Sequence, residues 1–196
     1  MSLHFDTGPQ DGIEMVRSGL RRLANRKSPL NLGRAGFDAL TVASRHPVYD
    51  LRADEIAHGG GLETAHPTGL RYLITSAGAA VAAAEVYTDA TGKASLLANL
   101  NYGPFVGASA QAFMDLANLP AVRSGEYEVR LLRFSAVFVV AVWLKAAVGA
   151  ADIIYPLAPA PGVLRAGTPY TTESFLAAIR PLAQQRVGKP DPTKLP

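Results

Sequence analysis

Apolar residues recur at helical spacing in three stretches of the chain. The first stripe runs from Ile13 to Leu23 and leaves three arginines outside it. Two similar stripes follow in the second half of the chain, and a proline lies inside the last one. We therefore predict helices at residues 12–26, 107–119 and 173–186, with a kink at Pro181.

Alternating and continuous apolar runs predict strands elsewhere. Residues 70–76 alternate and are rich in β-forming side chains. Residues 126–145 alternate at first and are then apolar on both faces, as in a covered central strand. A single strand of this length would span about 66 Å, so we expect a bend near residues 134–136. Residues 152–157 predict one more strand.

A hairpin is the most constrained element of the sequence. Residues 80–89 and 93–102 flank Ala90-Thr91-Gly92, a three-residue loop with glycine where a left-handed residue is needed. If Asp89 faces Lys93, then Glu85 faces Leu97. In this register the polar positions share one face of the hairpin, and they are Glu85, Tyr87, Ser95, Asn99 and Asn101.

The remaining segments complete the predicted organisation. Residues 28–36 are expected to form a loop, residues 37–44 a short helix closed by Pro47, and the Gly-rich residues 57–69 another loop. We predict an α+β fold, with an antiparallel or mixed sheet of about five to seven strands and three main helices packed on it. The predicted division is a helical N-terminal arm (1–45), a core domain (46–187) and a Pro-rich tail (188–196).

Composition narrows the class of protein. The 196 residues are 48% hydrophobic and 18% charged, so the chain can bury a core and is not disordered throughout. Cysteine is absent, which excludes disulfides, thiolate nucleophiles and cysteine-held metal clusters. No Gly-x-Gly-x-x-Gly or Gly-x₄-Gly-Lys-Ser/Thr motif occurs, so we predict no nucleotide or other cofactor.

The net charge and the hydropathy of the chain indicate which partners and which cellular compartment to expect. The net charge is +3 and the isoelectric point is about 9.3, a weak basic excess that does not favour nucleic-acid binding. The longest strongly apolar run, residues 134–144, is too short for a membrane-spanning helix. The first residues lack the basic and apolar regions of a secretory signal. We therefore expect a cytoplasmic protein without a membrane span.

One candidate site combines the hairpin with the Gly-rich loop. Glu85 is the candidate general base, with Asn99, Asn101 and Tyr87 as ligand-binding residues. His58 and His66 would complete a catalytic site if the loop folds over this face. The alternative is a solvent-facing strand surface with cross-strand hydrogen bonds. We predict no metal site, because a Gly-rich loop does not fix the geometry of His58, Glu63 and His66.

Two classes of function remain open from the sequence alone. The first is a non-catalytic protein-binding or assembly module that associates with itself or with another protein. Its contact surfaces would be exposed sheet edges and the arginines of the first helix, Arg17, Arg21 and Arg22. The second is a small-molecule-binding protein or a non-redox enzyme, hydrolytic or isomerising, that uses the Glu85 face. Whether the protein is an enzyme is not decided by the sequence.

Overall fold

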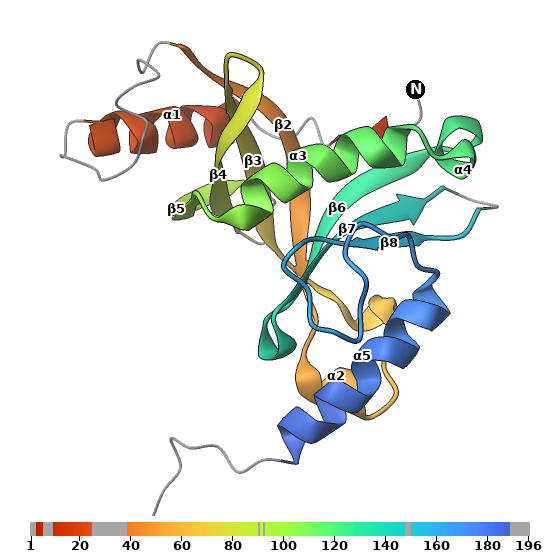
Figure 1. Cartoon of the computed structure of the whole chain (residues 1–196). Coiled ribbons are helices and arrows are strands. Elements are labelled where there is room, and N and C mark those ends of the chain that lie inside the picture. The colour runs from red at the N-terminus through yellow and green to blue at the C-terminus, as the bar shows by residue number, and fades with distance from the viewer. Residues whose placement is uncertain are drawn as a thin grey trace, which may run out of the picture.

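The computed structural model describes residues 3–5, 10–24, 39–89, 91, 93–147 and 150–188. In this part of the chain five α-helices accompany one mixed sheet of eight strands (Figure 1). The helices are α1 (Gln10–Ala24), α2 (Ala53–Ala57), α3 (Pro104–Ala117), α4 (Pro120–Ser124) and α5 (Thr172–Val187). The strands are β1 (Leu3–His4), β2 (Leu40–Asp50), β3 (His66–Ser76), β4 (Ala79–Thr88), β5 (Ala94–Asn101), β6 (Tyr127–Phe134), β7 (Val139–Ala146) and β8 (Ile153–Pro156). The fold is therefore α+β, and its sheet is larger than predicted.

Two antiparallel groups of strands meet in the middle of the sheet. The strand order is β5-β4-β3-β2-β6-β7-β8, and β1 also pairs with β6. The first four strands of this order form an antiparallel meander, and the last three form another. A short parallel contact joins the groups, with Val48 of β2 opposite Leu131 of β6. This contact brings together two segments that are far apart in the sequence.

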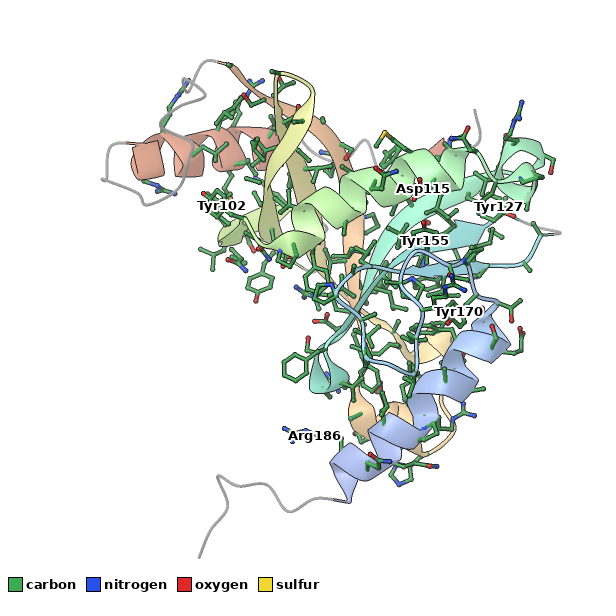
Figure 2. The ribbon with its side chains drawn as sticks, in the orientation of Figure 1. Tyr102, Asp115, Tyr127, Tyr155, Tyr170 and Arg186 are labelled. Carbon is green, nitrogen blue, oxygen red and sulfur yellow. The ribbon has the colours of Figure 1, made fainter. Side chains whose placement is uncertain are left out.

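Helices cover both faces of the sheet. Figure 1 shows α1 and α5 at opposite ends of the sheet, with α3 running across it. On β2, His46 contacts Phe113 of α3, whereas Tyr49 points to the other face and contacts Trp143 in the core beneath α5. Tyr155 of β8 donates a 2.8 Å hydrogen bond to Asp115 and so fixes α3 over the sheet (Figure 2). Burial is the main cause that raises the pKa of Tyr155 to about 12, and this bond adds to it.

The short helix predicted at residues 37–44 is wrong, because this region enters the central strand β2 at Leu40. Thr41 and Val42 are β-branched and favour extended backbone. Pro47 is tolerated because the parallel pairing with β6 begins only at Val48. The predicted arm boundary at residue 45 thus falls inside β2, and the predicted loop at 28–36 lies outside the described residues.

The hairpin is confirmed, but its predicted register holds only next to the turn. Thr88 faces Ala94 as expected, whereas Glu85 faces Asn99 instead of Leu97. Two register shifts account for the difference, since Ser95 and Ala98 are extra residues on β5. The loop predicted at residues 57–69 is too long, because β3 already begins at His66.

The three main predicted helices and the strands predicted at 70–76, 126–145 and 152–157 are confirmed with small changes of boundary, whereas the predicted Pro-rich tail from residue 189 onward lies outside the described residues. The predicted bend after residue 134 is a 3₁₀ turn, Ser135–Val137, between β6 and β7. Pro104 begins α3, where a missing backbone N–H is tolerated. Thr171 caps α5 by accepting a hydrogen bond from the Ser174 amide. Among the described residues, no helix is both long and apolar enough to cross a membrane.

Candidate functional site

A network of charges joins four strands on the face of the sheet that α3 covers. Arg133 of β6 donates from Nε and Nη2 to the two carboxylate oxygens of Asp50, at 2.7 and 3.0 Å. Its Nη1 donates to Oε2 of Glu85 at 2.6 Å, and Nη2 also reaches the hydroxyl of Thr68 at 3.3 Å. Burial opposes the charge of Arg133, but its hydrogen bonds and the two carboxylates outweigh burial and raise its pKa. Arg133 is thus the centre of the network.

A second arginine, Arg71 of β3, lies deeper in the same network. It is 2% exposed and faces Glu85 on one neighbouring strand and His46 on the other. Its Nε and Nη2 have no hydrogen-bond partner in the described part of the protein. Burial lowers the pKa of Arg71, while Glu85 raises it and Arg133 lowers it further. This guanidinium relies on charge attraction to Glu85 rather than on hydrogen bonds.

His46 of β2 is the cross-strand neighbour of Arg71 and lies beside the charge network. Its ring is fully buried and packs edge-on against Phe113, with ring centres 5.4 Å apart. Burial lowers the pKa of His46 to about 3, and the charge of Arg71 acts in the same direction. His46 is therefore neutral near neutral pH.

An apolar groove adjoins the charge network. It has a volume of about 540 Å³ and runs between the first turn of α3, the β6–β7 turn and the loop after β8. Val140, in its wall, is the cross-strand neighbour of Arg133 and shares the same sheet face. Its lining residues are Phe105, Ser135, Val137, Phe138, Val139, Val140, Pro159, Ala160 and Pro161, of which only Ser135 carries a polar side chain. A groove with a polar rim is suited to binding an apolar group.

Phe138 is the most exposed residue of this groove. Its side chain is 84% exposed, the largest value among the large hydrophobic residues described. Its backbone has φ +58° and ψ +37°, a left-handed conformation that is uncommon for a bulky residue. An aromatic side chain that is both strained and exposed contributes little to folding, so it points to a binding role.

The structure brings Glu85 next to Asn99 but gives the predicted ligand residues different surroundings. Glu85 and Asn99 are cross-strand partners, and Asn101 faces Ala83. The side chain of Asn101 accepts a 2.8 Å hydrogen bond from the Gly103 amide, which supports the start of α3. Tyr87 is 49% exposed and is paired with Leu96. The hydrogen bond described for Glu85 is the one it accepts from Arg133.

The two predicted catalytic histidines bind α2. The His58 ring is 2.6 Å from the Asp54 carbonyl oxygen, and the His66 ring is 2.9 Å from Oε1 of Glu55. The Gly-rich segment nevertheless reaches the charge network, through Thr68. In the described ranges no three His, Asp, Glu or Cys side chains are arranged to hold a metal ion.

The arginines of α1 lie on two flanks of the helix. Arg17 and Arg21 line a groove of about 220 Å³ against β2 and β3. Arg22 lies on the opposite flank and lines a groove against β5, where Glu14 also lies. The three arginines therefore do not form one basic patch.

Sequence reasoning missed the centre of the network. Arg130 binds Glu128 of the same strand at 2.6 Å, a local pair of the kind that sequence spacing can show. Arg133 instead binds Asp50, 83 residues away, through the parallel contact of β2 and β6. No sequence signal marks Phe138, because the apolar run that contains it predicts a strand covered on both faces, whereas its side chain is 84% exposed.

Comparisons with known proteins found no matching family model, curated protein or solved structure. The function is therefore inferred from the geometry of the site.

Proposed function

We propose that this chain is a non-catalytic protein-binding module that takes an apolar segment of a partner protein into the groove beside Phe138. The observation that carries the proposal is the 84% exposure of Phe138 in a left-handed backbone conformation. Exposed aromatic side chains are frequent anchors of protein interfaces. The requirements of folding do not account for the exposed side chain of Phe138.

The lining of the groove supports an apolar partner. Eight of its nine lining residues carry no polar group on the side chain, and prolines form part of its wall. Prolines and aromatic rings lose little conformational entropy when a partner binds, which favours affinity. The neighbouring network is balanced in charge, because Arg71 and Arg133 face Asp50 and Glu85. The network beside the groove therefore does not require a charged partner.

A photo-crosslinking residue at position 138 tests the proposal, with the same residue at the exposed Val187 as control. We expect one protein to be crosslinked at 138 but not at 187. The purified partner should then bind the unlabelled chain, and Phe138→Asp or Pro161→Arg should weaken binding at least tenfold. Absence of a specific crosslink, or equal affinity of these variants, would contradict the proposal.

A second candidate function is small-molecule binding in the same groove. Its support is the volume of about 540 Å³, which lies within the range of small-ligand sites, next to the polar Glu85–Arg133 pair. Native mass spectrometry of the gently purified protein separates the two candidates. A small extra mass that Glu85→Gln removes, while the variant stays folded, favours this second function. A bare chain that still binds a protein through Phe138 excludes it.

A further inference from the structure

The flank formed by α1 and β5 is a second surface with an open groove. β5 is the last strand of the sheet, and on its outer side no other strand of the described chain pairs with it. Its eight residues include no charge and no proline, which are common guards of edge strands. Leu96 is 58% exposed there, although it is apolar. This edge therefore presents an apolar side chain to solvent.

A groove of about 520 Å³ runs along the junction of the edge strand and α1. Ser95, Leu96 and Leu97 form its strand side, and Glu14, Met15, Ser18 and Arg22 form its helix side. Two glycines let α1 lie directly on the sheet, because a Cβ at Gly19 would overlap Leu97 and one at Gly12 would overlap Tyr72. The helix flank and the strand edge thus form one continuous surface.

The charges on the helix side are self-complementary. Glu14, Ser18 and Arg22 are spaced by four residues, so they lie in a row along the helix. Glu14 and Arg22 carry opposite charges at equal distances from Ser18. Neither has an ion-pair partner within the described ranges. If two such helices met antiparallel at Ser18, each Glu14 would face the Arg22 of the other helix.

We infer that a second copy of this chain docks on this flank, about a two-fold axis that passes close to Ser18. A two-fold interface requires a surface that complements itself, and the Glu14–Ser18–Arg22 row meets this requirement. The strand side of the groove, formed by Ser95, Leu96 and Leu97, lies beside this row and is covered by the second copy. The two extra residues of β5, Ser95 and Ala98, interrupt a regular ladder. The copies therefore associate through side chains rather than by extending the sheet.

This surface is separate from the proposed partner groove. α1 packs on the sheet face opposite to α3, whereas Phe105 of α3 lines the groove beside Phe138. Phe138→Asp should therefore leave self-association unchanged, and a failure of one proposal does not imply failure of the other.

Charge reversal tests the two-fold arrangement. Native mass spectrometry and light scattering should give twice 20.7 kDa for the wild type. Glu14→Arg places two arginines together across the interface, and Arg22→Glu places two glutamates together, so each variant should dimerise about tenfold to a hundredfold more weakly. The double variant should regain the dimer. An equimolar mixture of the two single variants should form a mixed dimer, because their charges then match across the interface.

Three results would overturn the inference. One is a wild type that stays monomeric at its highest soluble concentration. Another is dimerisation that neither reversal changes, which would place the interface elsewhere. The third is a mixture of the single variants that remains monomeric, since this would show that Glu14 and Arg22 do not face each other. Arg123→Glu, an exposed charge reversal on α4, is the matched control and should leave the mass unchanged.

Discussion

Arg133 of β6 binds Glu85 of β4 through a 2.6 Å hydrogen bond, although β2 and β3 lie between these strands in the sheet. In a flat sheet three strand spacings, together with the four-residue offset from Asp50 to His46 along β2, would separate their backbones by about 19 Å, which is more than the two side chains can span. The sheet must therefore coil strongly at this point. Thr68, an extra residue on β3, also binds Arg133. A bulge increases local twist, so Thr68 marks the position of the coil.

Loss of Arg133 should destabilise the fold. Arg133→Met leaves Asp50 and Glu85 partly buried without their shared cation, and we expect unfolding to become easier by about 2–3 kcal/mol. Urea denaturation followed by circular dichroism measures this change. Arg123→Met, at an exposed position, is the control. Equal stability of the two variants would show that the network contributes nothing to folding.

Substitution of Arg71 should not lower the stability of the fold, in contrast to substitution of Arg133. Its buried Nε and Nη2 lack hydrogen-bond partners in the described chain, so folding leaves these donors without the hydrogen bonds that water provides. Arg71→Met removes this penalty and retains most of the volume. We expect its stability to be unchanged or higher by about 1 kcal/mol in the same urea titration. A loss as large as that of Arg133→Met would mean that a water or ion completes the site.

Stability should fall in acid because of His46. The folded-state pKa of His46 is lowered to about 3 from 6.5, so the unfolded chain takes up the proton first as the pH falls. The stability that the neutral ring contributes is fully present above pH 6.5 and is lost progressively down to about pH 3, by about 1.4 kcal/mol per pH unit.

The substitution His46→Leu isolates this effect. The variant should show a flatter dependence of unfolding free energy on pH between 6.5 and 4 than the wild type. His58→Gln removes an exposed histidine and is the control. An unchanged slope in His46→Leu would assign the acid sensitivity to other groups.

Gly69 should tolerate no side chain. It has φ +155°, and a Cβ there would overlap the Val86 carbonyl oxygen of β4. Gly69→Ala therefore forces β3 and β4 apart, and we expect a loss of about 3 kcal/mol or more, read from the thermal transition. Gly78→Ala is matched for positive φ but has open space around it, so it should lose only about 1 kcal/mol. Similar losses in both variants would show that the close strand approach is unimportant.

Phe138→Gly should separate binding from folding. Glycine adopts a left-handed conformation without strain, and the exposed ring leaves no cavity when it is removed. We expect thermal stability to be equal to that of the wild type or higher by about 1 kcal/mol, while binding of the crosslinked partner is lost. Clear destabilisation would mean that the ring supports the β6–β7 turn.

Local patterns of the sequence predicted most elements, but not their long-range contacts. The hairpin of β4 and β5 follows from its turn residues, and the apolar stripe of α5 follows from residues such as Phe175 and Ile179. β2 was missed because Pro47 signals a break, whereas the pairing of β2 with β6 begins only after the proline, at Val48. The bulges at Ser95 and Ala98 leave no mark in the alternation of β5, so the partner of Glu85 was misplaced by two residues.

In the candidate site too, local features could be predicted from the sequence and long-range contacts could not. Glu85 stood out because it was the one acidic side chain on the polar face of the hairpin. Arg133 could not be connected to it, since Asp50 and Glu85 lie on strands whose order no local pattern reveals. The burial of Arg71 and His46 depends on the assembled sheet, and on Phe113 of α3 packing against the His46 ring, which also lies beyond sequence spacing.

The parallel contact of β2 with β6 has a consequence for synthesis of the chain. The two strands are separated by 83 residues at the Asp50–Arg133 pair, so one side of β2 has no partner until β6 leaves the ribosome. At roughly 5–20 residues per second this delay is on the order of ten seconds. During that time the first meander exposes the edge that later becomes the centre of the sheet. The nascent chain is therefore most prone to aggregation before its second half has emerged.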